Sequence, residues 1–287
     1  MLNLKFDMKI GYFIKNDALR TDARVKALLA RLEASGLEVS EVGPAAGMAP
    51  GMQMLLSIGG DGTFLDATRL AAGAGVPVLG VNMGRMGFLS ETGAEDIASL
   101  LLSGRYCVEE RAMIEVKLRN AVGAPFLPDS PFWPYALNEV SVMRCGGAML
   151  GIDVTVGCEK LPTYWADGLL VSTSTGSTAY SLSVGGPICL PDTEILIIAP
   201  VSPHNLNVRP LIVPLHTEIG ISLQARSGSV MFTMDNSVHT IPSDTQIRLG
   251  AAPLKAKRVN AGKTNFIGAL KSRLLWGGDI RNSGEQR

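Results

Sequence analysis

The sequence predicts an α/β N-terminal domain with a Rossmann-like parallel sheet, followed by a β-rich C-terminal domain. Over the first part of the chain, apolar strand-like runs alternate with segments of helical periodicity, an order typical of a parallel sheet covered by helices. Beyond about residue 108 the apolar segments become short and mostly alternating, which is typical of antiparallel sheets. The expected domains are 1–108 and 109–259, and the tail at 260–287 is expected to pack back on the first domain.

Strand and helix patterns alternate in the N-terminal part. Val25, Leu28, Leu29 and Leu32 follow the spacing of one helix face, and Gly36 supplies a stop signal. Continuous apolar runs bounded by Gly or Pro are typical of buried parallel strands. Strands are expected at 9–14, 54–58 and 76–81, and two more helices at 64–72 and 94–104.

The C-terminal part is predicted to contain many strands and little helix. Its one short helix candidate is "STAYSLSVGG" (177–186), and "KTNFIGALKSRLLWGGD" (263–279) favours a helix in the tail. The Pro-rich stretch "GAPFLPDSPFWP" (123–134) is expected to be a hairpin connection, with a flap over a site as the alternative. Strands are expected at 113–120, 136–143, 151–156, 193–200, 217–226, 228–234 and 245–250.

The composition argues against several classes of protein. Lys plus Arg and Asp plus Glu number 26 each, so bulk charge gives no reason to expect nucleic acid or a membrane as partner. The chain lacks the apolar stretch of a signal peptide or membrane span, so a soluble cytoplasmic protein is expected. Its four cysteines are widely spaced without a CxxC pair, which favours buried reduced thiols over a zinc site.

A glycine-rich turn, "GGDGT", follows one of the predicted parallel strands. Gly59, Gly60 and Gly62 allow the backbone to approach a ligand closely, and the amides of the following helix favour an anion. The turn lacks the lysine of a Walker A loop and the third glycine of a Rossmann fingerprint. The stretch, which ends at Thr63, is therefore expected to be a phosphate loop of another kind.

Asp61 lies in the middle of this loop, and its carboxylate has three possible roles. It could cap the helix that follows, hold a magnesium ion that neutralises phosphates, or accept the proton of an attacking hydroxyl group. Three glycines are more than a cap requires, which favours binding or catalysis over capping.

Two further segments place polar residues between apolar ones. Between Ser172 and Ser183, eight of twelve residues are Ser or Thr, which suits a ligand with many hydroxyl and phosphate oxygens, although a solvated turn is the alternative. Asn138 and Glu139 are adjacent within an apolar strand, so one of them points inward or the strand ends at a cleft. Such a pair could hold the two hydroxyls of a ribose, and a sheet-edge or solvent-facing pair is the alternative.

In this order and at these separations, the three segments resemble the NAD kinase family. The string "STSTGSTAYSLSVGGP" is the most specific part, because lipid kinases and phosphofructokinases contain loops similar to "GGDGT". "GVNMGRMGFLSE" (80–91) and "PHNLNVRPLIVP" (203–214) are similar to the same family, and the resemblance covers most of the chain. It implies an α/β domain and a β-rich domain with the active site between them.

The resemblance implies transfer of the γ-phosphoryl group of ATP to the 2′-hydroxyl of the adenosine ribose of NAD, which yields NADP. It also implies a divalent metal, normally Mg²⁺, although no residue of the sequence is assigned directly as its ligand. A homodimer or homotetramer is implied, in which a neighbouring subunit contributes to NAD binding. Inorganic polyphosphate is an alternative to ATP as the phosphoryl donor.

The resemblance also implies roles for single residues. Asp61 matches the catalytic aspartate, which accepts the proton of the 2′-hydroxyl, and Phe88 matches an aromatic residue near the adenine. Asn138 and Glu139 match the pair that holds the ribose nearest the nicotinamide, and Asp167 matches an acid at the nicotinamide end. The other residues implied in NAD or phosphate binding are Gly59, Gly60, Gly62, Thr63, Thr175, Thr178, Ala179, Tyr180 and Ser183, with a looser match at Asp235 and Asn236.

Two other functions are weighed against this one. A lipid kinase with the same glycine loop would need an apolar entry surface, whereas the string rich in Ser and Thr favours a nucleotide. A non-catalytic NAD-binding sensor would keep Asn138 and Glu139 but would have no need of Asp61.

Overall fold

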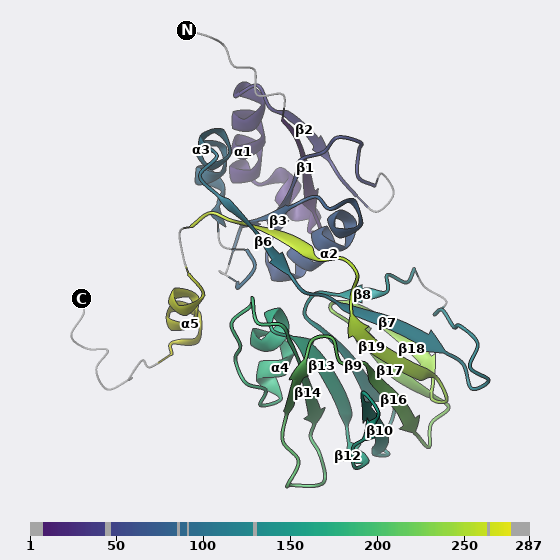
Figure 1. Ribbon diagram of the computed structural model, residues 1–287. Coiled ribbons are helices and arrows are strands. Elements are labelled where there is room, and N and C mark those ends of the chain that lie inside the picture. Colours follow the sequence, from purple (N-terminus) through teal and green to yellow (C-terminus); the bar gives the residue numbers. More distant parts are fainter. Residues whose placement is uncertain are drawn as a thin grey trace. The chain divides into compact units, whose positions relative to one another are not determined.

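The computed structural model describes residues 8–43, 47–84, 87–90, 92–128, 131–262 and 265–276. The chain divides into two compact units, an α/β unit formed by 1–109 with 257–287 and a β-rich unit formed by 110–256 (Figure 1). The predicted fold class, a parallel α/β part followed by a β-rich part, is confirmed.

Strands and helices alternate along the first part of the α/β unit, and one strand and one helix from the end of the chain complete it. Its elements are β1 (Lys9–Ile14), η1 (Asp17–Thr21), α1 (Ala23–Ala34), β2 (Glu38–Glu41), β3 (Met54–Gly59), α2 (Asp61–Ala71), η2 (Ala72–Ala74), β4 (Val78–Asn82), β5 (Thr92–Gly93), η3 (Ala94–Asp96), α3 (Ile97–Ser103), β6 (Cys107–Arg111), β20 (Ala256–Asn260) and α5 (Phe266–Leu274).

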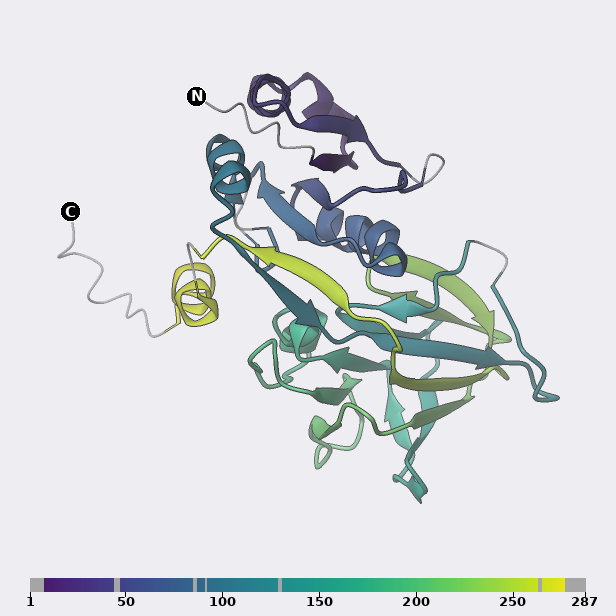
Figure 2. The same ribbon diagram turned by 45° about the horizontal axis from the view of Figure 1, so that its top comes forward.

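The sheet of the α/β unit has the strand order β2-β1-β3-β4-β20-β6, and β5 pairs with β4. The pairings of β1 with β2 and β3, and of β4 with β3, β5 and β20, are parallel. Figures 1 and 2 show β20, the yellow strand, lying beside β6, so segments far apart in the sequence complete one sheet.

Helix α1 presents to the core the face that its sequence spacing predicts. Val25, Leu28 and Leu32 are buried and belong to a cluster with Ile10 and Leu56 from the neighbouring strands. Burial of such side chains is worth about 1.5–3 kcal/mol each, which is enough to hold the helix against the sheet.

The β-rich unit is formed almost entirely by strands. Its elements are β7 (Ile114–Arg119), β8 (Tyr135–Ala136), β9 (Glu139–Arg144), β10 (Leu150–Val156), β11 (Glu159–Lys160), β12 (Tyr164–Ala166), β13 (Gly168–Thr173), η4 (Thr175–Thr178), α4 (Tyr180–Ser183), β14 (Ile195–Val201), β15 (Leu211–Pro214), β16 (Ile219–Gln224), β17 (Ser229–Met234), β18 (Ser237–Pro242) and β19 (Gln246–Ala251).

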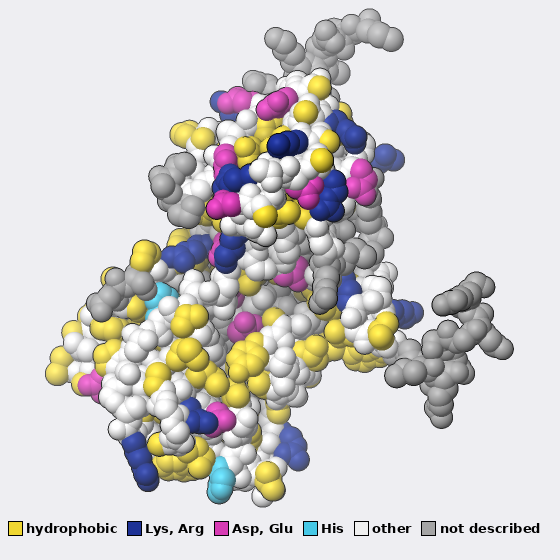
Figure 3. Space-filling model, turned by 180° about the vertical axis from the view of Figure 1, so that it is seen from behind, with side chains coloured by type: hydrophobic (Ala, Val, Ile, Leu, Met, Phe, Trp, Pro, Cys, Tyr) yellow, Lys and Arg dark blue, Asp and Glu magenta, His cyan; other side chains and the backbone are white. Residues whose placement is uncertain are grey.

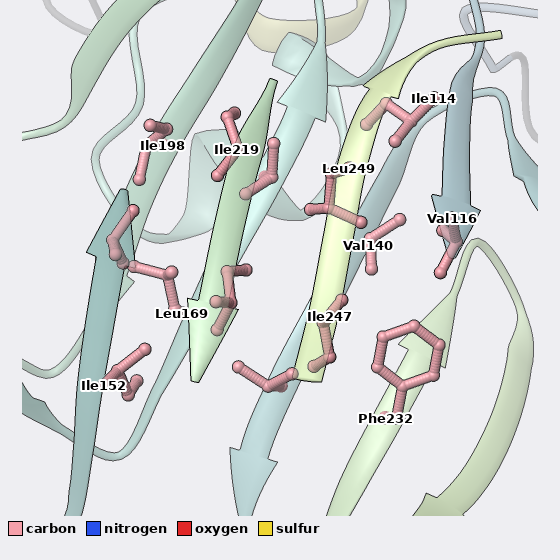
Figure 4. Close-up of a cluster of buried hydrophobic side chains, with 14 of the residues drawn as sticks. Ile114, Val116, Val140, Ile152, Leu169, Ile198, Ile219, Phe232, Ile247 and Leu249 are labelled. Atoms are coloured by element: carbon pink, nitrogen blue, oxygen red, sulfur yellow. The ribbon is translucent and has the colours of Figure 1, made fainter. Parts of the chain in front are cut away.

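Two antiparallel sheets make up the β-rich unit. One has the order β11-β10-β16-β19-β7-β8, with β12 paired to β10, and the other has the order β15-β14-β13-β9-β17-β18. Figure 4 shows their common core, in which Ile247 of the first sheet lies beside Val140 and Phe232 of the second, and Ile152 of the first lies beside Leu169 of the second. Alternating apolar side chains on both inner faces create this core, as the sequence pattern predicts.

The Pro-rich stretch at 123–134 runs along the edge of β7. The N–H of Phe126 donates to the carbonyl of Leu118 at 2.9 Å, and the N–H of Val116 donates to the carbonyl of Pro134 at 2.8 Å. The stretch is therefore a hairpin connection, as predicted, and residues 129 and 130 lie outside the described ranges.

The expected burial of the cysteines is wrong. All four are free thiols, but Cys107 and Cys158 are exposed, while Cys145 and Cys189 are only partly buried. Cys158 lies in the turn between β10 and β11, where side chains point to solvent.

Helix length and surface charge are the features that distinguish membrane-spanning and highly charged proteins. Within the described ranges, no helix is long and apolar enough to cross a membrane. On the face seen in Figure 3, basic and acidic side chains are interspersed.

Candidate active site

The glycine turn connects β3 directly to α2. β3 ends at Gly59, and α2 begins at Asp61, three residues before the predicted start. The N-cap residue is Gly60, which has no side chain, so the reading of Asp61 as the helix cap is wrong. Because Gly62 lies inside the first turn of the helix, the sequence pattern hides the true start. A Cβ atom on Gly59 would come within 2.4 Å of Thr63 Oγ1, which explains the glycine at the strand end.

The carboxylate of Asp61 turns toward the connection that follows β4. Its Oδ2 accepts a hydrogen bond from the N–H of Phe88 at 2.7 Å, and its Oδ1 accepts from the N–H groups of Leu89 and Ser90 at 3.0 Å each. A carboxylate offers about four lone-pair positions, so these three amides leave at most one for another donor. The side chain is therefore fixed in orientation, with Oδ2 as the less occupied oxygen.

Gly87 makes this close approach possible. A Cβ atom at this position would lie 2.0 Å from Asp61 Oδ1 and 2.2 Å from its Cγ. Any residue other than glycine would therefore displace the carboxylate. The segment from Gly87 to Ser90 thus wraps closely around Asp61.

Phe88 is half-buried, and the C-terminal helix α5 covers part of its ring. The ring centroids of Phe88 and Phe266 are 6.0 Å apart, and the guanidinium carbon of Arg273 lies 5.1 Å from the Phe88 centroid. The cation–π geometry and the aromatic pair hold α5 against the same segment that holds Asp61. The adenine contact of Phe88 stays a prediction.

Arg258, which sequence reasoning missed, supports this segment from β20. Its side chain is almost fully buried, and its Nη1 donates to Glu109 Oε2 at 3.0 Å while Nε donates to the carbonyl of Leu89 at 3.4 Å. Asn260 Nδ2 donates to the other oxygen of Glu109 at 2.6 Å. A charged residue in the short strand "AKRVN" was the only signal in the sequence, and its partner lies about 150 residues away.

In the β-rich unit, Asn138 and Glu139 lie where the chain passes from one sheet to the other. β8 ends at Ala136 in the first sheet, and β9 begins at Glu139 in the second. Asn138 is 7% exposed and Glu139 is 9% exposed, so the reading of a solvent-facing pair is wrong. The predicted strand is broken at this polar pair.

Part of the string rich in Ser and Thr holds this break in place. Thr173 Oγ1 donates to the carbonyl of Leu137 at 2.6 Å, and Ser172 Oγ donates to the carbonyl of Asn138 at 3.2 Å. A Cβ atom on Gly176 would lie 2.3 Å from the same Asn138 oxygen. These residues act as a scaffold for the break between β8 and β9.

Two other hydroxyl groups of the string are available to bind a ligand. Among the described residues, the buried Thr175 Oγ1 and Ser181 Oγ have no hydrogen-bond partner. Such buried polar groups are costly unless a ligand or water completes them. Thr178 and Ala179 are partly buried and Tyr180 and Ser183 are exposed on the same turn, as a binding surface requires.

The looser matches, Asp235 and Asn236, form the turn between β17 and β18. Asp235 directs its carboxylate at the backbone of the residue pair: Oδ1 accepts from the N–H of Asn138 at 2.7 Å and of Glu139 at 3.2 Å. Its Oδ2 accepts from the N–H of Leu137 at 2.9 Å. Asn236 is exposed.

Glu139 has an unusual protonation equilibrium. Burial, and secondly the negative charge of Asp235, raise the pKa of Glu139 to about 8, although a hydrogen bond from the backbone N–H of Tyr180 acts in the opposite direction. Its Oε2 is buried without a partner among the described residues. Glu139 is therefore largely protonated at neutral pH, and it can both donate and accept a hydrogen bond.

Asp167 lies between β12 and β13 and pairs with a single arginine. Arg144 Nε donates to Asp167 Oδ1 at 2.6 Å, and the N–H of Arg144 donates to the carbonyl of Asp167 at 2.9 Å. Both side chains are partly exposed. The role of Asp167 at the nicotinamide end stays a prediction.

The donor set fits a metal brought by a substrate rather than one held in a protein cage. The described residues contain no cluster of three or more His, Cys, Asp or Glu side chains that could hold a metal ion. Mg²⁺ is commonly bound by one or two carboxylates together with substrate phosphates and water.

The fold and the site define a phosphotransferase: an α/β unit with an amide-anchored aspartate after its glycine turn, and a β-rich unit with a buried amide and carboxylate pair. Two family models match the chain, the ATP-NAD kinase N-terminal domain over residues 41–103 and the ATP-NAD kinase C-terminal domain over residues 137–261. The chain belongs to the NAD kinase family.

Curated relatives agree with this assignment, and solved structures share the fold. The NAD kinase of Flavobacterium psychrophilum is 38% identical over 80% of this chain and 78% of its own length. The NAD kinase of Bacteroides fragilis is 38% identical over 79% of this chain and 78% of its own length. The yeast NADH kinase solved with NADH shares the fold, with a TM-score of 0.82 and 20% identity over 97% of this chain and 90% of that chain. An NAD kinase from Archaeoglobus fulgidus, solved with ATP, also shares the fold. Its TM-score is 0.71, and it is 23% identical over 94% of this chain and 98% of its own chain.

Proposed function

We propose that this protein transfers the γ-phosphoryl group of ATP to the 2′-hydroxyl of the adenosine ribose of NAD and so forms NADP. The observation that carries the proposal is the fixed carboxylate of Asp61, which three backbone amides orient while leaving at most one acceptor position. A single open acceptor position suits one hydroxyl group. Family membership supports NAD as the substrate that carries this hydroxyl group.

In this mechanism Asp61 accepts the hydrogen bond of the 2′-hydroxyl and orients it toward the γ-phosphorus. It takes the proton as the new P–O bond forms, while the bond from the γ-phosphorus to the β,γ-bridging oxygen breaks and ADP leaves with that oxygen. Asn138 and Glu139 hold the ribose nearest the nicotinamide. The hydroxyl group of Thr175 makes a hydrogen bond to the bound NAD. Mg²⁺, when bound with the triphosphate, supplies charge neutralisation. Positioning and electrostatics account for most of the rate enhancement in phosphoryl transfer, and general-base assistance contributes about 10²–10⁴-fold.

The experiment is steady-state NADP formation by the wild-type protein and by the variant Asp61→Asn. The variant keeps the shape of the side chain but loses its charge, so kcat is expected to fall by about 10²–10⁴-fold. Asp66→Asn is the matched control on the same helix, because it removes an ion pair with the exposed Lys15 and is expected to keep kcat within about twofold. A near-normal kcat in Asp61→Asn would exclude the base role.

The remaining parts of the proposal concern donor, acceptor and assembly. ATP is proposed as the donor and is tested against inorganic polyphosphate; diacylglycerol and sphingosine test the lipid kinase alternative. Tight NAD binding without NADP formation would instead identify a sensor. A cytoplasmic homodimer or homotetramer is proposed, and exposed apolar side chains such as Trp165 and Ile212 on short strands of the β-rich unit support self-association.

A further inference from the structure

The turn between β17 and β18 makes four hydrogen bonds to one short piece of backbone. The carboxylate of Asp235 accepts from the N–H groups of Leu137, Asn138 and Glu139 at 2.9, 2.7 and 3.2 Å. In return, the N–H of Asp235 donates to the carbonyl of Glu139 at 2.9 Å. One residue thus engages three consecutive residues through both its side chain and its main chain.

This backbone needs such a partner because of its place in the fold. Leu137 and Asn138 lie between β8 and β9, where the chain leaves one sheet and enters the other, so their N–H groups have no strand ladder to join. Buried backbone donors without a partner are costly, and three successive amides pointing the same way form a site for an anion. The carboxylate of Asp235 is that anion.

Asp235 adopts an uncommon backbone conformation at this turn. Its φ is 50°, in the left-handed region that non-glycine residues rarely occupy, although Asp and Asn tolerate it better than most. A glycine would satisfy the backbone more easily but would provide no acceptor for the three amides.

We propose that Asp235 is a positioning residue for NAD binding, whose carboxylate fixes the backbone of 137–139 so that the Asn138 and Glu139 side chains point at the ribose. This inference rests on the proposed function, because it takes from it the role of the pair. Asp235 itself need not touch NAD, in contrast to the contact that the family resemblance implies.

The electrostatics of the pair agree with this role. Among the residues that the structure describes, the groups that act on the Glu139 carboxyl are the Asp235 carboxylate from the β17–β18 turn and the backbone N–H of Tyr180 from α4. The charge of Asp235 favours the protonated form of Glu139, and a protonated carboxyl can donate one hydrogen bond to a ribose oxygen and accept another. Removal of that charge should therefore move the titration of Glu139 to lower pH.

The test is the variant Asp235→Asn. Asparagine keeps the shape and tolerates the positive φ, but it is neutral, and its NH₂ group cannot accept from a backbone amide. We expect KM for NAD to rise about tenfold or more, because hydrogen bonds to a charged acceptor are the stronger ones. KM for ATP is expected to change less than twofold. The midpoint near pH 8 expected in the pH profile of kcat/KM for NAD should move to lower pH.

Two further variants separate geometry from charge. Asp235→Glu keeps the charge but displaces the carboxylate, so KM for NAD should rise while the midpoint of the pH profile stays near that of the wild type. Asp244→Asn, at an exposed turn at the other end of β18, is the matched control and should leave both quantities unchanged. Hydrogen exchange of the amides of 137–139 provides a readout independent of activity, and it should be faster in Asp235→Asn.

The outcomes distinguish the two proposals. Unchanged KM for NAD and unchanged exchange of the three amides in Asp235→Asn would overturn the positioning role, as would an equal rise of KM for NAD and ATP. If Glu139→Gln leaves KM for NAD unchanged, the ribose role in the proposed function fails instead. Should Asp235→Asn not fold, Asp235→Glu decides by the same KM comparison, and wild-type KM for NAD in that variant would overturn the inference.

Discussion

Replacing Gly87 with alanine should displace the Asp61 carboxylate while leaving the carboxylate group itself unchanged. The new Cβ atom would lie 2.0 Å from Asp61 Oδ1, 2.2 Å from Cγ and 2.3 Å from Oδ2, so either the carboxylate or the segment from Phe88 to Ser90 must move. Both movements break the three amide hydrogen bonds that orient the side chain.

The size of the effect follows from those bonds. Hydrogen bonds to a charged group are each worth about 1.5–3 kcal/mol, and water replaces part of this at a half-buried site, so the anchoring should weaken by about 2–4 kcal/mol. A displacement of about 1 Å at a reacting group commonly lowers the rate about 10²-fold. We therefore expect kcat for NADP formation to fall about 10²-fold in Gly87→Ala, with a decrease of a few degrees in the melting temperature.

The assay is steady-state NADP formation together with thermal unfolding. Gly84→Ala is the matched control, because Gly84 lies in the same connection and a Cβ atom there meets no other atom within 4 Å. It should behave like the wild type. If Gly87→Ala has the same kcat as Gly84→Ala, the anchored geometry of Asp61 is not required for catalysis.

Three other predictions follow from single contacts. Glu139 binds its proton more tightly in the folded protein than at its usual pKa of 4.5, so folding stability should decrease as pH rises from about 5 to about 8, and Glu139→Gln should flatten this dependence in urea denaturation. Arg258→Gln leaves Glu109 partly buried without its ion pair and should cost about 3–5 kcal/mol of unfolding free energy, whereas Arg248→Gln, from an exposed pair with Glu218, should cost at most about 1 kcal/mol. Thr175→Val removes a buried hydroxyl that has no partner among the described residues, so the melting temperature should stay the same or rise while KM for NAD increases; an unchanged KM would show that NAD does not use this hydroxyl.

The fold class follows from the sequence because periodicity reports which face of an element is buried. Val25, Leu28 and Leu32 identify α1 in this way, and the alternating segments identify the sheets of the β-rich unit. β20 was not predicted, because it is short and charged. Its Arg258 is buried and pairs with Glu109 on β6, and no local pattern reveals a partner so distant in the sequence.

In the candidate site, the sequence predicts the functional side chains but not the contacts that hold them. Asn138 and Glu139 stand out in the sequence because they interrupt an apolar strand, and Asp61 stands out as a carboxylate within a glycine-rich turn. What holds them does not stand out, because the partners of Asp61 and Asp235 are backbone amides, which every residue but proline possesses. The same ambiguity applies to hydroxyls: the sequence does not distinguish Thr173, which supports the backbone of Leu137, from Thr175, which has no partner among the described residues.

The most direct test of the central claim is an end-point assay of the purified protein with NAD, ATP and Mg²⁺, run beside reactions with polyphosphate as donor and diacylglycerol as acceptor. Phosphorylation of NAD at the 2′-hydroxyl, lost in Asp61→Asn and retained in Asp66→Asn, is the predicted result. Absence of NADP under all donors, or equal NADP formation by the wild type and Asp61→Asn, would contradict the account.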